Sequence, residues 1–141
     1  MACGWRSLCS RRIYSSLMTE QPVGTHAVHR WYARPVFYVA DVNRAIRFYV
    51  EQLGFEKRWH EGDGAGTVCQ VDRGECEIIL CQDTTRSDKA RLFVELTPEG
   101  LAELLREIAE RSVPSKESWW GYDVIQIHDP DGNELLFPFP E

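Results

Sequence analysis

Residues 39–55 read VADVNRAIRFYVEQLGF, and the fold class follows from this stretch. The strand-like run Pro35–Val39 before it is rich in β-branched and aromatic residues, which predicts a strand. Asp41 is a favourable N-cap, and residues 42–53 place apolar side chains at helical spacing. Gly54 then ends the helix. A strand therefore leads directly into a helix.

Three more strands are predicted after this helix. They cover Phe55–His60, Thr67–Asp72 and Glu75–Cys81, and the last two form a hairpin around Arg73-Gly74. The segment Asp83–Asp88 is entirely polar and serves as a linker. The first half of the chain is thus a βαβββ module.

The same order of elements returns after the linker. In order, the predicted elements are a strand Ala90–Leu96, a helix capped by Thr97 that runs through Arg111, a turn or short strand Ser112–Ser118, a strand Tyr122–His128, a tight turn Asp129–Asn133 and a strand Glu134–Phe139. We therefore expect an α+β fold. Its two tandem modules, residues 33–82 and 89–140, would form a curved mixed sheet around a cleft, which is the natural ligand site.

Charge is unevenly distributed along the 141 residues, whose formal net charge is -6. Residues 1–17 contain three Arg and no acidic residue, so residues 18–141 carry 13 basic and 22 acidic side chains. The leader 1–17 suits either a disordered organellar transit peptide or upstream sequence before a true start at Met18. Residues 18–32 would then be an N-terminal extension of a single domain, 33–141.

This acidic balance disfavours a nucleic-acid partner and favours a neutral or cationic one. No apolar run has the roughly 18 residues of a membrane-spanning helix. The five cysteines include no CxxC pair, which indicates a reducing compartment. We expect a cytoplasmic protein, or an organellar one if the leader is a transit peptide.

The two modules together resemble the vicinal oxygen chelate superfamily, which includes glyoxalases, extradiol dioxygenases and bleomycin resistance proteins. The resemblance covers residues 34–139, and the motifs that carry it are Val39–Val42, Ala45–Tyr49, Leu53–Phe55, Trp120–Tyr122 and Asp129–Glu134. It implies the glyoxalase/bleomycin resistance fold. It does not fix the activity, because one scaffold hosts several functions.

In the metal-dependent members of this superfamily, His and Glu side chains from four strands hold a divalent ion. The resemblance places these positions on Arg34, Leu80, Arg91 and Leu136. Arg has no lone pair to donate and Leu has no donor atom, so these residues do not bind a metal. We therefore expect no metal, no cofactor and no catalytic residue, as in the metal-free bleomycin resistance branch.

Strand alternation predicts which side chains face the ligand. Arg34 shares a face with Val36 and Tyr38, and Arg91 shares a face with Phe93 and Glu95. The expected ligand-binding residues are Arg34, Val36, Tyr38, Trp59, Arg91, Phe93, Glu95, Trp119, Trp120, Tyr122 and Leu136. Two alternatives stay open: the Trp residues could pack at an edge or in a dimer, and the two Arg could be structurally paired or bind an anion.

The functional hypothesis is a metal-free homodimer that sequesters an aromatic or cationic, antibiotic-like molecule such as a bleomycin in a dimer cleft, as the resemblance to bleomycin resistance proteins implies. One alternative is a glyoxalase- or dioxygenase-like enzyme with a divergent site. Another is a structural or regulatory protein whose Trp residues form an interface.

Overall fold

The computed structural model describes residues 31–140 of the chain. The predicted leader, residues 1–17, and nearly all of the predicted extension, residues 18–32, lie outside the described residues. The first module contains β1 (Val36–Val39), α2 (Val42–Arg47), η1 (Phe48–Gln52), β2 (Glu56–His60), η2 (Glu61–Gly64), β3 (Val68–Arg73) and β4 (Cys76–Gln82). The second contains β5 (Arg91–Phe93), α3 (Pro98–Glu110), β6 (Lys116–Trp119), β7 (Asp123–His128) and β8 (Glu134–Pro138).

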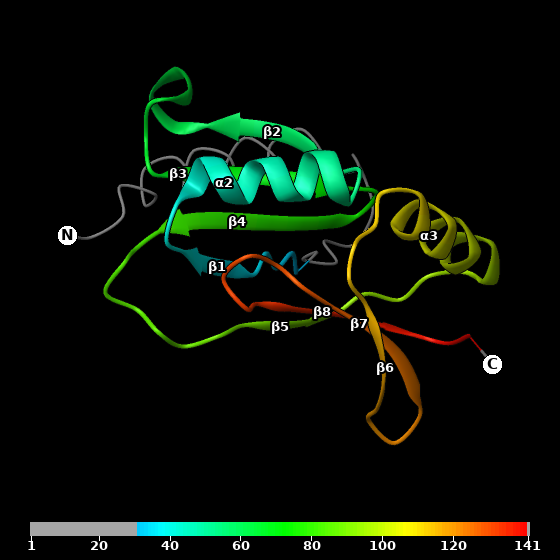
Figure 1. Ribbon diagram of the computed structural model, residues 1–141. Coiled ribbons are helices and arrows are strands. Elements are labelled where there is room, and N and C mark those ends of the chain that lie inside the picture. The colour runs from blue at the N-terminus through cyan, green and yellow to red at the C-terminus, as the bar shows by residue number, and fades with distance from the viewer. Residues whose placement is uncertain (1–30, 141) are drawn as a thin grey trace, which may run out of the picture.

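Each module folds into its own four-stranded mixed sheet. The strand order is β1-β4-β3-β2 in the first sheet and β5-β8-β7-β6 in the second, so the two halves have the same topology. In both, the first strand pairs in parallel with the last, and the other neighbours pair antiparallel. The α+β fold of two βαβββ modules is therefore confirmed, with two sheets that do not close on each other (Figure 1).

The predicted helix 42–53 begins as expected but changes its winding. Asp41 caps α2 by accepting from the backbone N–H groups of Asn43 and Arg44, at 2.9 and 3.1 Å. After Arg47 the chain continues as the π-helical turn η1, in which the Leu53 N–H donates to the Phe48 carbonyl. One extra residue is therefore accommodated in the last turns of the helix.

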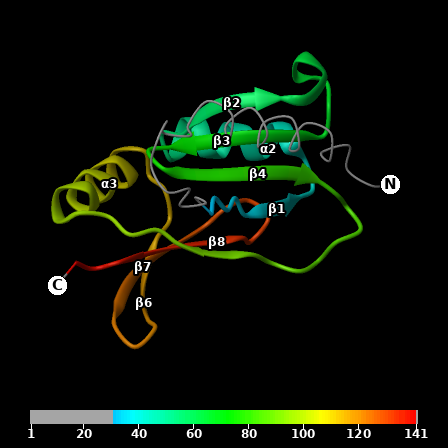
Figure 2. The same ribbon diagram turned by 180° about the vertical axis from the view of Figure 1, so that it is seen from behind.

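One hydrophobic core joins the two modules. From the first module it takes side chains of β1, α2, η1, β3 and β4, and from the second it takes α3, β7 and β8. The buried members include Phe37, Tyr49, Leu104, Ile127 and Phe137. Figure 2, seen from behind, shows β3 and β4 with α2 beyond them. The face of each sheet that turns away from this shared core is called its outer face below.

The turn between β7 and β8 fastens the second module to the first. Asp131 Oδ1 accepts from the Ala40 N–H at 2.8 Å and from Arg44 at 3.1 Å. The buried hydroxyl of Tyr49 donates to Asp129 Oδ2 at 3.0 Å. Asn133 Nδ2 donates to the same carboxylate at 2.9 Å. The residues of the DPDGN turn are therefore structural contacts between modules.

Among residues 31–140, no helix is both long and apolar enough to cross a membrane.

Candidate functional site

The outer face of the second sheet carries an aromatic cluster. The rings of Phe93 and Trp120 pack edge to face, with centroids 5.5 Å apart. Trp120 directly follows β6, and Phe93 ends β5, the strand at the opposite edge of the sheet. The two rings therefore meet across the sheet, over the strands that contain Leu136 and Val124, both fully buried. Phe93 and Trp120 remain 40% and 39% exposed, so part of each ring is available to a ligand.

A charged pair adjoins these rings. The Arg91 guanidinium lies 5.0 Å from the centroid of the Trp120 ring and donates from Nε to Glu134 Oε2. His128 Nε2 lies 3.2 Å from Glu134 Oε1 and 3.3 Å from Gln126 Nε2. Burial opposes ionisation of Glu134, but the hydrogen bonds from Arg91 and His128 outweigh it and lower the pKa of Glu134. Arg91 is thus neutralised by a nearby carboxylate.

A different polar cluster occupies the outer face of the first sheet, centred on Gln70. This side chain is fully buried, and its Oε1 accepts from Arg34 at 2.6 Å and from Trp59 Nε1 at 3.0 Å. Its Nε2 donates to Asp72 at 2.7 Å and to Glu77 at 2.8 Å. Four hydrogen bonds therefore satisfy the Gln70 amide, three with charged side chains and one with the Trp59 indole.

Predicted site residues of the first sheet lie together. Val36, Tyr38 and Trp59 pack against the buried outer-face side chains Val68, Ile79 and Cys81. The guanidinium of Arg86, in the linker, lies 4.0 Å from the centroid of the Tyr38 ring.

Three predicted residues do not join either cluster. The register of β6 with β7 pairs Lys116 with Gln126, so by alternation Trp119 points to the opposite face from Trp120, and it is 70% exposed. Tyr122 lies in the turn after Trp120 and is 47% exposed. Glu95 follows β5 and is exposed, whereas Glu134 is the acid that neutralises Arg91.

The expected position of Leu80 is corrected by the structure. Leu80 is fully buried in the shared core, and the outer-face residue of this part of β4 is Ile79. Ile79 pairs with Val36, as Leu136 pairs with Phe93 in the second sheet. The local sequence Ile78-Ile79-Leu80 is apolar throughout, so its pattern does not reveal which residue faces outward.

Sequence reasoning did not select the polar residues Gln70, Asp72 and Glu77, nor Gln126, His128 and Glu134. All six lie on β3, β4, β7 and β8. The alternation that leads from Arg34 to Val36 and from Arg91 to Phe93, carried across the paired strands, finds them, because Gln70 pairs with Ile79 and Gln126 pairs with Leu136. Within residues 31–140, no group of three or more His, Cys, Asp or Glu side chains is arranged to hold a metal ion.

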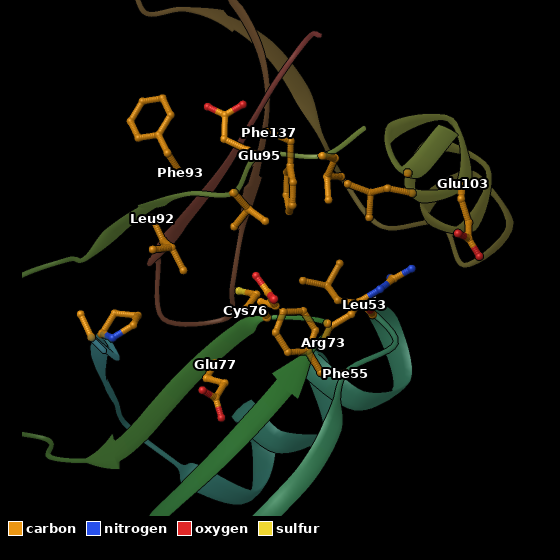
Figure 3. A pocket seen from close by; sticks show the side chains of 18 residues that line it. Leu53, Phe55, Arg73, Cys76, Glu77, Leu92, Phe93, Glu95, Glu103 and Phe137 are labelled. Atoms are coloured by element: carbon orange, nitrogen blue, oxygen red, sulfur yellow. Dashed lines mark hydrogen bonds between the residues drawn. The ribbon is translucent and has the colours of Figure 1, made fainter. Parts of the chain in front are cut away.

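A cavity of about 530 Å³ lies elsewhere, between the modules on the core side of the sheets (Figure 3). Of the predicted site residues, Phe93 and Glu95 line it, and Figure 3 shows both side chains on the far side of their strand from its apolar interior. The apolar interior of the cavity therefore lies on the opposite side of the sheets from the outer-face clusters, while Phe93 and Glu77 belong to both linings.

Paired βαβββ modules with polar and aromatic outer faces define a class of ligand-binding and catalytic domains. The sequence profile of the Glyoxalase/Bleomycin resistance protein/Dioxygenase superfamily matches residues 30–137, and the chain belongs to this family. No protein among curated sequences matches it.

Solved structures with the same fold include both binding proteins and enzymes. The bleomycin-binding protein of Streptomyces verticillus, complexed with copper(II)-bleomycin, is 28% identical, covers 81% of this chain and 99% of its own, and has a TM-score of 0.59. TnmS3, an antibiotic binding protein from Streptomyces sp. CB03234, is 22% identical, with coverages of 82% and 100% and a TM-score of 0.63. Lactoylglutathione lyase from Agrobacterium tumefaciens is 15% identical, with coverages of 77% and 92% and a TM-score of 0.61. The last two show the fold alone.

Proposed function

We propose that this protein binds a small aromatic or cationic molecule, of antibiotic type, on the outer face of its second sheet and sequesters it without a metal. The observation that carries this proposal is the contact of Trp120 with both Phe93 and Arg91. Its partly exposed ring offers a face to a flat or cationic group, and Trp is the best such platform among side chains.

The charges near the site are compatible with a cationic ligand. Arg91 is paired with Glu134, and Arg34 donates to Gln70, which is itself held by Asp72 and Glu77. Arg91 is therefore neutralised directly, Asp72 and Glu77 bind the other end of the amide that Arg34 contacts, and the net charge of -6 favours approach of a cation.

The proposal includes three further expectations. The protein acts as a homodimer whose two chains enclose the ligand, since Trp31 and Tyr122 leave large aromatic surface exposed. It acts in the cytoplasm, and sequestration there confers antibiotic resistance. The 28% identity to a protein solved with copper(II)-bleomycin supports this choice of ligand class.

The test is isothermal titration of the protein with metal-free and copper(II)-loaded bleomycin. We expect Trp120→Ala to weaken binding about tenfold, because a ring contact of this kind contributes about 1–2 kcal/mol. The matched control is Trp119→Ala, which removes a neighbouring ring from the opposite face and is expected to leave the affinity unchanged. Sedimentation of the same samples measures the proposed dimer.

Two results would contradict the proposal. One is the absence of binding tighter than millimolar to either form of bleomycin and to other planar cationic antibiotics. The other is a stoichiometric metal in the purified protein together with turnover of a substrate, which would favour the enzyme hypothesis instead.

A further inference from the structure

The cavity between the modules has mainly apolar walls, and part of this apolar surface is exposed to solvent. Its deeper residues, Leu53, Phe55, Leu104 and Phe137, are at most 7% exposed and belong to the shared core. Nearer the opening, the cavity is lined by hydrophobic side chains that remain only partly buried: Cys76, Leu92, Val94 and Leu96. Figure 3 shows Leu53, Phe55 and Cys76 on one side of the space and Leu92 and Phe137 on the other.

The volume of about 530 Å³ lies within the range of small-molecule sites, about 300–1,000 Å³. Walls that are mainly apolar favour a hydrocarbon group over water, because water needs several polar partners. The inner part of the cavity is therefore suited to an alkyl chain or an aromatic ring.

The charged groups around this apolar interior are mainly acidic. Glu75, Glu77, Glu95 and Glu103 line the cavity, and Arg73 is its only basic lining residue among residues 31–140. Arg73 is already engaged: it donates to both carboxylate oxygens of Glu107, at 2.7 and 3.2 Å, and to the Leu53 carbonyl at 2.7 Å. Glu77 is already held by Gln70, and the remaining glutamates outnumber Arg73, so an incoming cation meets net negative charge at the margin.

We infer that this cavity is a second binding site, distinct from the outer faces of the sheets, for a cationic amphiphile: an apolar chain or ring that carries an ammonium group. The apolar part enters between β5 and the end of the β3–β4 hairpin, and the ammonium group stays near the glutamates. Since both modules line the cavity, an occupant also stabilises their association.

The test compares two probes of equal chain length, octylammonium and octanoate, titrated into the full-length protein at low ionic strength. Octylammonium is expected to bind, and octanoate to bind about tenfold more weakly, because the margin is acidic. The double variant Glu75→Gln and Glu103→Gln is expected to reduce this difference. Equal binding of both probes by the unmodified protein would overturn the charge argument and the proposed ligand class.

Two substitutions of Val94 test whether the apolar chain of octylammonium binds inside the cavity. Val94→Phe fills part of the cavity and is expected to abolish octylammonium binding, whereas Val94→Ala enlarges it and is expected to keep binding. Thermal melts of both variants check that each is folded. Unchanged binding by a folded Val94→Phe protein would overturn the proposal.

Cys76 provides an independent readout, because it is a free cysteine that lines the cavity. Octylammonium is expected to slow its alkylation by iodoacetamide, followed by peptide mass spectrometry. Burial raises the pKa of Cys76 to about 11, so the reaction is followed at about pH 9, where some thiolate forms and octylammonium, like Lys with a pKa of about 10.4, keeps its charge. Binding without protection of Cys76 would place the probe elsewhere and contradict the inference.

Trp120→Ala separates this site from the proposed outer-face site. It is expected to leave octylammonium binding unchanged while it weakens binding of bleomycin. If octylammonium binding is lost in Trp120→Ala, the cavity is not the site. If octylammonium instead dissociates a dimer, a second copy of the chain covers the cavity, and the small-molecule proposal is wrong.

Discussion

At the scale of single residues, Gln70 determines how the outer face of the first sheet is organised. Its carbonyl oxygen accepts from Arg34 and Trp59, while its amide nitrogen donates to Asp72 and Glu77. An amide group has an acceptor oxygen and a donor nitrogen, so Gln70 can bind the cation Arg34 through one atom and the two carboxylates through the other.

Gln70→Glu is predicted to destabilise the protein by about 3 kcal/mol at neutral pH, because it places a third carboxylate beside Asp72 and Glu77 in a buried position. Urea denaturation measures the free energy of unfolding. The matched control is Gln126→Glu at the equivalent position of the second sheet, where the neighbour is His128 and the cost should be smaller. Equal losses in the two variants would contradict this account.

The buried hydrogen bond between Tyr49 and Asp129 connects the two modules. Burial raises the pKa of Asp129, and the hydrogen bonds from Asn133 and Tyr49 only partly offset this effect. The donors to Asp129 therefore offset part of the cost of burying its charge.

Tyr49→Phe is predicted to lower the free energy of unfolding by about 1–2 kcal/mol, since it removes one donor from a buried carboxylate. The ring and its packing against Phe48 and Phe55 remain, so the loss reports the hydroxyl group. Denaturation at pH 7 measures it. As a control, Tyr122→Phe changes an exposed hydroxyl and should have no measurable effect.

At the scale of elements, α3 illustrates how local signals position a helix. Thr97 Oγ1 accepts from the Gly100 N–H at 3.1 Å, and Pro98 occupies the first turn. The buried side chains of Leu101, Leu104 and Ile108 then place this helix on the shared core.

Thr97→Ala is predicted to destabilise the protein by about 1 kcal/mol, the usual loss of an N-cap. Thr97→Ser keeps a hydroxyl in the same place and should retain most of the stability. Thermal or urea unfolding of the two variants compares them directly. If the Ser variant loses as much as the Ala variant, the hydrogen bond is not the cause.

The helices and strands could be predicted because the residues that define them are close together in the sequence. The candidate site could be predicted only in part. Asp41, Gly54 and Thr97 mark helix ends within a few residues, and Val36 and Tyr38, which alternation puts on one face, pack together on the outer face. The partners of Arg34 and Arg91 depend on strand register, which brings together residues far apart in sequence. The pairing of Arg91 with Glu134 could therefore not be derived from either strand alone.

At the scale of the whole molecule, ion pairs and turns hold the modules together across their common core. Arg73 at the end of β3 bonds to Glu107 of α3, and Arg111 donates to the Gln52 carbonyl at 3.2 Å. The hydrogen bond from Arg73 lowers the pKa of Glu107, so this carboxylate stays ionised in the folded protein where the unfolded chain begins to protonate.

The contribution of Glu107 to stability is therefore present at neutral pH and is lost as the pH falls. Glu107→Gln is predicted to be less stable than the unmodified protein near pH 7. The difference should shrink as the pH falls below about 4.3, the ordinary pKa of Glu, toward the lowered pKa of Glu107. Urea denaturation across this range checks the trend, with Glu110→Gln, an exposed carboxylate, as the control. A difference that does not change with pH would show that the ion pair is not responsible.

All strand pairs of the first sheet are formed within residues 36–82, before β5 begins. During synthesis, this half can therefore assemble its sheet while the second half is still being translated. The face that later joins the shared core, with Phe37, Val71 and Leu80, would meanwhile lack the covering supplied by α3 and β8. Such a nascent chain exposes an apolar surface, so the completeness of translation matters for solubility: a truncated product ending near the linker would be prone to aggregate.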